Sequence, residues 1–301
     1  MNRTISVEKP ERLDAFLRRE IPVLLSQDQV SNSKIRRLVM AGKIFVNGRQ
    51  CRVPAFDLRP GARVAIELDE EKFNYEKQPD DIDYVLTEKD VLFEDEDLII
   101  VNKPAFLPTE ETMVKDRKNL HQCVVDYLWS KNPGLRNPPY AGIMHRLDRE
   151  TSGAILFTKT RQVNKAISEI FQGRELKKIY TAKVTAKKNP ANAKGFPKEF
   201  SVDNFIGRIS SKSSRCTIGV LPESKGGQRA WTDFELIKAE GNSAWYRCIL
   251  HTGRTHQIRV HLSLSGMPIE GDVLYGGIQS DRIKLHSTVL EFIHPVTGKI
   301  I

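Results

Sequence analysis

The sequence contains few cysteines. Only four of its 301 residues are cysteine, at positions 51, 123, 216 and 248, and no two of them form a Cys-x-x-Cys pair. This spacing argues against a zinc site and against the disulfide framework of small secreted proteins, and a chain of this length can bury a core without such links. The cysteines are therefore expected to be reduced and structural.

Apolar runs are short throughout the chain. The longest, such as LIIV at 98–101 and AILF at 154–157, are far below the roughly 18 to 20 residues that a membrane helix needs. The first ten residues also lack the apolar core of a signal peptide. These absences predict a soluble, cytoplasmic protein that does not contact a membrane.

Signatures of nucleotide cofactors and of serine nucleophiles are missing as well. Gly226-Gly227 and Gly276-Gly277 lack the spacing and the strand, turn and helix setting of a phosphate-binding loop, so no cofactor is expected. Ser152, His145 and Asp148 are neighbours in sequence, but a catalytic triad is a spatial arrangement, and the Gly-x-Ser-x-Gly pattern is absent around Ser152. Hydrolysis by a serine nucleophile is therefore not favoured.

Three histidines recur every five residues, at His251, His256 and His261. The sequence predicts a turn followed by a helix from about Thr255, which ends near Gly266. Positions five apart on a helix point about 140° away from each other, so His256 and His261 cannot easily share one ion. No metal site is expected, and both histidines are interpreted as structural.

The net charge of +9 is unevenly distributed. Residues 1–68 hold 13 Lys and Arg against 7 Asp and Glu, residues 69–97 hold 3 against 13, and residues 98–301 hold 31 against 18. Two basic regions thus flank an acidic one. A polyanion is the economical partner for two basic regions, because each cation near a phosphate releases counterions. A surface that is merely basic and soluble is the alternative that composition leaves open.

Residues 10–68 look self-contained. Leu13, Phe16 and Leu17 have helical spacing, and a second helix follows, for which Ser31 or Ser33 can provide the cap. Asn47-Gly48 is a strong hairpin signal, and residues 62–68 alternate as a last strand. Cations concentrate around the second helix and the hairpin, which predicts one strongly positive face: Lys34, Arg36, Arg37, Lys43, Arg49 and Arg52.

This arrangement resembles the small RNA-binding module named after a ribosomal small-subunit protein, which also occurs in some RNA-modifying enzymes. The resemblance covers about residues 10–68 and rests on residues 33–36 and 43–48. It implies a small α/β domain that binds RNA through four cations: Lys34, Arg36, Arg37 and Lys43. A basic domain for protein contacts is the alternative, because charge alone specifies a partner only loosely.

The rest of the chain has the pattern of a mixed α+β fold. Residues 69–90 form an acidic, poorly periodic linker, and residues 91–301 form the second domain, which begins as strand, acidic turn and strand. A helix is predicted at 120–129, a buried strand after Gly153, a helix capped by Thr160, and a strand from Lys177. The last third alternates as an antiparallel sheet does.

Asp148 lies on a connection that leads into the buried strand after Gly153. Such connections on a rigid scaffold commonly present catalytic groups. A carboxylate can attack an electrophilic carbon if cations such as Arg146 and Arg259 keep it ionised. The alternative is a turn residue whose carboxylate accepts backbone N–H bonds, and spacing alone leaves both interpretations open.

His145-Arg146-Leu147-Asp148 with Thr151-Ser152-Gly153 strongly resembles the signature of RluA-type pseudouridine synthases, which isomerise uridine in ribosomal or transfer RNA. The resemblance covers about residues 91–298. Further family elements follow in order: residues 102–104, 178–182, 253–261, 271–277, 285–287 and 294–298. The chain departs at residues 105–109, where the family usually has a glycine-containing stretch and a histidine, which concerns the approach of the substrate.

The resemblance implies a catalytic domain with a mixed, largely antiparallel central sheet and assigns roles to four residues. Asp148 matches the catalytic aspartate, Tyr180 the active-site tyrosine, and Arg259 the cation that pairs with the aspartate in bidentate geometry. Arg146 resembles the residue that enters the stack where the target nucleotide flips out. His145 and Thr151 are placed with the RNA-contacting set, and their main expected task is to orient the loop.

The resemblance thus implies a cofactor-free RNA pseudouridine synthase, active on large-subunit ribosomal RNA by preference and with transfer RNA as the alternative substrate. A monomer with RNA as its partner is expected. A non-catalytic RNA-binding or ribosome-assembly protein is the runner-up. A carboxylate glycosidase would need a second acid some 5–10 Å away, for which Glu150 is the near candidate in sequence.

Overall fold

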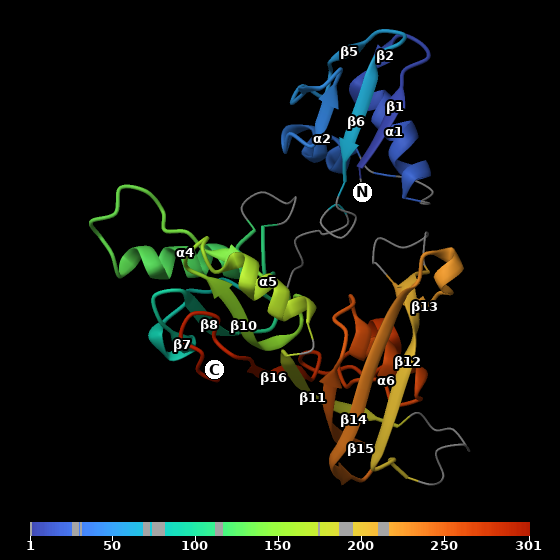
Figure 1. Cartoon of the computed structure of the whole chain (residues 1–301). Helices are drawn as coiled ribbons and strands as arrows, with labels where there is room; N and C mark the ends of the chain where they lie inside the picture. Colours follow the sequence, from blue (N-terminus) through green and yellow to red (C-terminus); the bar gives the residue numbers. More distant parts are fainter. Residues whose placement is uncertain are drawn as a thin grey trace. The chain divides into compact units, whose positions relative to one another are not determined.

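The computed structural model describes most of the chain, namely residues 2–25, 30, 32–68, 73, 82–111, 117–173, 175–186, 195–209 and 217–301. The chain divides into two compact units (Figure 1). Met1–Pro79 makes up most of the first, and Asp80–Glu111, Lys118–Arg208 and Ile218–Ile301 make up the second. Each unit is built around its own apolar core.

The first unit packs two helices against a four-stranded sheet of order β1-β6-β3-β4. Its elements are β1 Asn2–Ser6, β2 Glu11–Arg12, α1 Leu13–Leu24, α2 Asn32–Met40, β3 Ile44–Val46, β4 Arg49–Gln50, β5 Asp57–Leu58 and β6 Arg63–Glu67. The two predicted helices, the hairpin and the last strand are confirmed. Strand β1 was not predicted; it pairs antiparallel with β6 and extends the unit to residue 2.

The core of the first unit follows the apolar spacing of the sequence. Leu13, Phe16 and Leu17 of α1 are fully buried, and they share one cluster with Ile35 and Leu38 of α2. Burial of each such side chain stabilises the fold by about 1.5–3 kcal/mol. The helix pair is therefore held by its apolar faces, which leaves the polar faces free to meet solvent.

The β3–β4 hairpin turns as the Asn47-Gly48 pair predicts. Both residues have positive φ, 49° and 78°, as a type I′ turn requires. The Asn47 side chain also accepts the backbone N–H of Arg63 at 2.8 Å, which ties the turn to β6. Ser31, one of the two predicted helix caps, lies outside the described residues.

The second unit is organised on a ten-stranded sheet of order β13-β12-β14-β15-β11-β16-β10-β8-β7, with β9 paired to β10 (Figure 1). Its strands are β7 Val91–Glu94, β8 Leu98–Lys103, β9 Gly142–Ile143, β10 Ser152–Thr158, β11 Lys177–Thr185, β12 Glu199–Arg208, β13 Ile218–Val220, β14 Gln228–Glu240, β15 Ser243–Leu250 and β16 Leu285–Glu291. Among these described strands, all pairings are antiparallel except that of β10 with β16. The sheet is thus mixed and largely antiparallel, as expected.

Helices cover the sheet: α4 Leu120–Ser130, α5 Asn164–Gln172 and α6 Gln257–Leu264, with short 3-10 turns at Glu88–Asp90, Glu223–Lys225 and Val273–Tyr275. Residues of α4 pack with Ile155 and Phe157 on one face of β10, whereas α5 packs with Ala154 and Leu156 on the other face of this strand. Strand β10 is buried along its whole length because it is covered on both faces. Helix α6 packs over β11, β14 and β15.

Two helix starts differ from the sequence prediction. The predicted cap Thr160 was wrong: α5 begins at Asn164, and the Thr160 hydroxyl donates instead to the Asp97 carboxylate at 2.8 Å. Helix α6 begins at Gln257 rather than near Thr255, because His256 has left-handed backbone geometry with φ of 54°. His256 therefore precedes the helix and is not subject to its side-chain spacing.

The predicted linker at 69–90 falls only partly within the described residues. Phe73 is buried in the core of the first unit, and Ile82 and Tyr84 pack against a core cluster of the second. Three of the cysteines, at positions 51, 123 and 248, are free and buried, as expected, and Cys216 lies outside the described residues. Within the described part of the chain, no helix has the length and apolar character to span a bilayer.

Three strands of the sheet, β10, β16 and β11, are in register at Gly153, Ser287 and Tyr180. Gly153 and Ser287 pair where β10 meets β16, and Ser287 pairs in turn with Tyr180 of β11. Gly153 has φ of 116°, and a Cβ atom there would collide with the Ser287 backbone, so this close approach requires glycine. The connection that carries Asp148 therefore ends beside the strand that carries Tyr180.

Candidate active site

The connection between β9 and β10 is held in place by hydrogen bonds from two other segments. Lys103, at the end of β8, is fully buried, and its ammonium donates to the carbonyl oxygens of Pro104, Leu107 and Arg149 at 3.0, 2.8 and 3.0 Å. The Thr109 hydroxyl donates to the Leu147 carbonyl at 2.9 Å. The residues on both sides of Asp148 are thereby fixed.

The number of hydrogen-bond acceptors around Lys103 equals the number of N–H groups on its ammonium. Three carbonyl acceptors satisfy the three N–H groups of a protonated ammonium. Burial lowers the pKa of Lys103 to about 7, while the negative charges of Glu150 and Asp148 act in the opposite direction. In the sequence, Lys103 is recognisable only as part of the family element at residues 102–104, where a lysine directly follows a buried strand and precedes a proline.

The Asp148 carboxylate lies beside two basic side chains. Its Oδ2 atom is 3.3 Å from Nη1 of Arg259 and 3.8 Å from Nε2 of His256, and its side chain is 20% exposed. Burial acts to raise the pKa of Asp148, but His256, Arg259 and Lys103 lower it, and the net pKa is below the ordinary value. Asp148 is therefore an ionised carboxylate that remains partly accessible.

Arg259 is buried in α6 and makes its bidentate pair with Asp272, not with Asp148 as expected from the sequence. Its Nε donates to Asp272 Oδ2 at 2.7 Å and its Nη2 to Asp272 Oδ1 at 2.9 Å. Nη1 is left to contact Asp148. Asp272 thus fixes the guanidinium plane, and one remaining N–H reaches the second carboxylate.

Two glycines allow the backbone to pack closely around Asp272, a residue that was not predicted from the sequence. A Cβ atom on Gly271 would meet the Arg282 carbonyl, and one on Gly277 would meet the carbonyl of Ile269. Asp272 itself is 1% exposed, and its backbone carbonyl accepts from Gly277 at 2.8 Å. The family motif at 271–277 contained the signal for it: an acid among glycines that permit close packing.

His256 lies between Tyr275 and Asp148. The Tyr275 hydroxyl accepts the backbone N–H of Ile218 at 3.0 Å and is 2.8 Å from His256 Nδ1. His256 Nε2 is the ring nitrogen that lies 3.8 Å from the Asp148 carboxylate. Burial lowers the pKa of His256, and the negative charge of Asp148 acts in the opposite direction. The sequence had suggested a purely structural role for His256.

Tyr180 lies on the face of β11 that meets the core clusters under both α4 and α6. Burial raises the pKa of its hydroxyl to about 12; a hydrogen bond with Ser287 lowers that pKa and the charge of Asp148 raises it. The phenol is therefore neutral at physiological pH. The structure brings Asp148, Tyr180 and Arg259 into one site from three separate elements.

The other residues of the motif have structural or peripheral positions. His145 stacks on Phe171 with 4.6 Å between ring centroids and accepts the Leu156 backbone N–H at 2.9 Å; burial lowers its pKa to about 3. Thr151 is buried, and its N–H donates to the Asp148 carbonyl at 3.1 Å. Arg146, whose side chain is 42% exposed, pairs with Glu110 at 2.8 Å. His145 and Thr151 thus hold the loop, whereas Arg146 is accessible.

The remaining histidines of the series have separate partners. His251 contacts Asp233 at 2.6 Å, and His261 contacts Thr232 and Asn204 at 3.0 and 3.2 Å. Glu150, the second acid considered from sequence, pairs with Arg149 at 3.1 Å.

In the first unit, the four cations singled out from sequence differ in exposure. Arg36 is exposed, Arg37 is intermediate, and the side chain of Lys43 is 53% exposed and lies 3.5 Å from Glu67. Lys34 is only 8% exposed, whereas the sequence placed it on a strongly positive face. Arg36 and Lys43 are therefore the accessible members of the set.

Comparisons with known proteins agree with this architecture. A model of the RNA pseudouridylate synthase family matches residues 97–264, and a model of the S4 domain matches residues 29–64. An uncharacterized RNA pseudouridine synthase of Synechocystis is 32% identical over 300 residues, which cover 96% of this chain and 84% of the relative. Ribosomal large subunit pseudouridine synthase D of Escherichia coli K12 is 30% identical over 305 residues, with the same coverage of both chains.

A solved structure is similar in fold over about two thirds of this chain. Human RNA pseudouridylate synthase domain containing 4 aligns with a TM-score of 0.54 at 22% identity, over 68% of this chain and 84% of its own. The fold and the family models together define an RNA-modifying enzyme with an appended S4 domain. The chain belongs to the RNA pseudouridylate synthase family. It is an RNA pseudouridine synthase, an isomerase whose substrate is RNA.

Proposed function

We propose that Asp148 is the catalytic carboxylate and that the target uridine flips out of its stack to reach it. The observation that carries this proposal is the position of the Asp148 carboxylate: it is ionised, 20% exposed, and held beside the buried Arg259 and His256. A carboxylate serves as a nucleophile when its environment keeps it deprotonated and its orbitals accessible. Both conditions hold here.

The reaction rearranges bonds within one nucleotide. The bond between the anomeric carbon and N1 of uracil breaks, the ring turns, and a bond between the anomeric carbon and carbon 5 forms; carbon 5 loses a proton and N1 gains one. Attack on carbon 6 of the ring, attack on the anomeric carbon, and assisted proton removal from the sugar all require an ionised carboxylate. No external oxidant, reductant or leaving-group acceptor enters the balance.

Tyr180 and Arg146 are proposed to handle the flipped nucleotide. The neutral Tyr180 ring offers a stacking surface for the uracil, and its hydroxyl can take part in proton movement. Arg146, which is partly exposed and pairs with Glu110, would fill the space that the uridine leaves in the stack. Unstacking a base costs a few kcal/mol, which such an interaction offsets.

We further propose large-subunit ribosomal RNA as the substrate, because several relatives similar along almost the whole chain are named ribosomal large subunit pseudouridine synthase D. The S4 domain would capture RNA through Arg36, Arg37, Lys43 and, in part, Lys34. In this proposal residues 1–68 form the RNA-binding domain, 69–90 a linker and 91–301 the catalytic domain. The enzyme would act as a monomer in the cytoplasm, where the ribosome is assembled.

The test is release of label from RNA that carries tritium on carbon 5 of uracil. The purified protein should release tritium from a large-subunit ribosomal RNA transcript without loss of strand integrity, and should do so far more slowly with a transfer RNA transcript. Faster release from transfer RNA would overturn the substrate assignment, and release of free uracil would indicate a glycosidase. Mapping of pseudouridine in cells with and without the protein then identifies the positions.

A further inference from the structure

The strands behind the active site present two unlike faces. On β11, β15 and β16, Ala182, Tyr246 and Leu285 are buried in the cluster that contains α6 residues. Their neighbours in sequence, such as Thr181 and Trp245, point to the opposite face and are only half-buried. The face that bears Trp245 therefore has an aromatic side chain with accessible surface.

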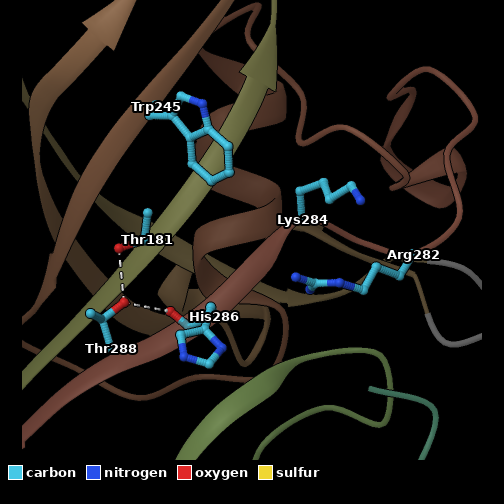
Figure 2. A pocket seen from close by; sticks show the side chains of 6 residues that line it. All are labelled: Thr181, Trp245, Arg282, Lys284, His286 and Thr288. Carbon is cyan, nitrogen blue, oxygen red and sulfur yellow. Dashed lines mark hydrogen bonds between the residues drawn. The ribbon is translucent and has the colours of Figure 1, made fainter. Parts of the chain in front are cut away.

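A pocket of about 400 Å³ lies on this face (Figure 2). Its lining consists of one aromatic ring, three basic side chains and two hydroxyl groups: Thr181, Trp245, Arg282, Lys284, His286 and Thr288. In the close-up, the six-membered ring of Trp245 points toward the space that Lys284, Arg282 and His286 border on the other sides. A volume of this size is sufficient for a base with its sugar.

The polar groups of the pocket are pre-arranged. The Thr181 and Thr288 hydroxyls are 2.8 Å apart, and the Thr288 hydroxyl donates to the His286 carbonyl at 3.3 Å, so oxygen lone pairs remain for a ligand. Arg282 donates to the Ile283 carbonyl at 3.1 Å and lies 3.4 Å from the Ser152 hydroxyl, and neither partner neutralises its charge. In the described part of the chain no carboxylate forms an ion pair with this guanidinium.

Carboxylates do pair with the other cations around the pocket. Lys284 contacts Asp281, a side chain that is 71% exposed. On either side of the indole, Lys183 pairs with Glu270 at 2.8 Å, and Lys238 pairs with Glu240 at 2.8 Å. Because the Asp281 side chain is largely exposed, water can solvate its carboxylate when a phosphate takes its place at Lys284. Arg282, which has no carboxylate partner among the described residues, therefore makes the net charge around the pocket positive.

We propose that this pocket is a second RNA-binding site, which takes one unpaired nucleotide of the substrate RNA away from the target uridine. Its base stacks on Trp245, its phosphate meets Arg282 and Lys284, and the hydroxyls of Thr181 and Thr288 contact its base edge or its ribose. Stacking on an aromatic ring beside a positive charge is how proteins bind unpaired RNA without strong sequence preference. The proposal rests on the RNA substrate of the enzyme and is independent of the role given to Asp148.

The pocket also adjoins the active site through the sheet. His286 Nδ1 lies 2.9 Å from the hydroxyl of Ser152, the first residue of β10 after the catalytic connection. Burial, together with the charge of Arg282, lowers the pKa of His286, so this ring is a neutral hydrogen-bonding group. The second site thus extends the RNA contact surface to the opposite face of the strands that carry Tyr180 and Ser287.

Tryptophan fluorescence of the full-length protein tests the proposal. With Trp129 and Trp231 replaced by phenylalanine, Trp245 is the remaining reporter among the three tryptophans. An unstructured six-nucleotide RNA should quench it at saturating concentration, and Arg282→Gln should weaken that binding and lower its log–log salt slope by about 0.7, the value for one phosphate on a single strand. Absence of quenching at all concentrations would overturn the proposal.

Paired variants separate stacking from folding. Trp245→Ala should weaken binding of natural ribosomal RNA about tenfold, whereas Trp245→Phe, which keeps an aromatic face, should retain most of the affinity. Trp129→Phe, on α4, serves as the control for removal of a tryptophan, and thermal unfolding checks that each variant folds. Single-turnover isomerisation of a minimal stem-loop should be unchanged in the Trp129→Phe control.

Equal affinity of Trp245→Ala and the parent for natural RNA would reject the site, and would point to a protein or another ligand on this face. Absence of isomerisation in the parent itself would instead contradict the proposed function. The two failures are therefore distinguishable in the same experiment.

Discussion

The cations of the first unit and those of the active site differ in burial and in partners. Arg36 and Lys43 are exposed on a helix and beside a hairpin, whereas Lys103 and Arg259 are buried and hold two or three hydrogen-bond acceptors each. An exposed cation acts on a distant phosphate through a field that salt screens. A buried cation with fixed partners orients a neighbouring group. We therefore propose that the same residue types serve RNA capture in the first unit and positioning of catalytic groups in the second.

The largest effect should follow from Asp148→Asn, which keeps the shape of the side chain and removes its charge. We expect isomerisation to fall by on the order of a thousandfold or more, because the proposed catalytic carboxylate loses its charge. Tritium release under single-turnover conditions measures the rate. Asp126→Asn, at an exposed position of α4, is the matched control. Turnover of Asp148→Asn within tenfold of the parent would refute the catalytic assignment.

Arg259→Ala should reduce both activity and stability, since it leaves the buried Asp272 without its partner. Breaking one side of a buried pair costs about 3–5 kcal/mol of the free energy of unfolding, which denaturant titration measures. Arg259→Lys keeps the charge without the planar fork and should recover only part of this free energy. If Arg259→Ala unfolds as the parent does, Asp272 is not a structural partner and the contrast between the two units fails.

A smaller effect concerns pH. The folded-state pKa of Asp148 lies below its ordinary value of 3.8, so the ionised carboxylate stabilises the fold above that value, and this stabilisation is lost as pH falls through the folded pKa. The parent should therefore exceed Asp148→Asn in free energy of unfolding by a constant amount between about pH 5 and 7, and the difference should shrink below about pH 4. A difference that grows on acidification would contradict the sign.

The smallest effect is expected in the first unit. Arg36→Gln combined with Lys43→Gln should weaken binding of natural RNA several-fold and lower the salt slope by about 0.7–0.9 for each phosphate that the variant no longer neutralises. Isomerisation of a short stem-loop at saturating concentration should not change. Lys165→Gln, an 88% exposed cation of the second unit, is the control. A reduced rate at saturation would mean that these cations take part in positioning as well as capture.

Local sequence patterns predicted most elements correctly. The helices at Leu13 and Leu120, the Asn47-Gly48 hairpin and the buried strand after Gly153 all depend on residues close together in sequence, whose spacing carries the information. The start of α5 was mistaken because Thr160 is a good cap by type, yet Asp97, 63 positions earlier, takes its hydroxyl. A competing partner from a distant segment is invisible to a local pattern.

For the site, the residue types were readable and their pairings were not. The motif at 145–153 and the resemblance it carries brought Asp148, Tyr180 and Arg259 forward from sequence, and the structure brings the three together. Sequence did not reveal that Arg259 donates two N–H groups to Asp272, that His256 Nε2 lies beside Asp148, or that Lys103 hydrogen-bonds to two loops. Each of these depends on a distance between elements that chain order does not specify.

The sequence by itself determined the two basic regions, the kind of chemistry and the residues that could perform it, because composition, periodicity and motif spacing are properties of the chain. Tertiary structure decided which charges are buried and which acceptors they meet, since burial changes both the strength of an ion pair and the pKa of its members. It also decided which side chains of β11, β15 and β16 pack against α6. Alternation along a strand predicts two faces, but only packing selects the one that α6 covers.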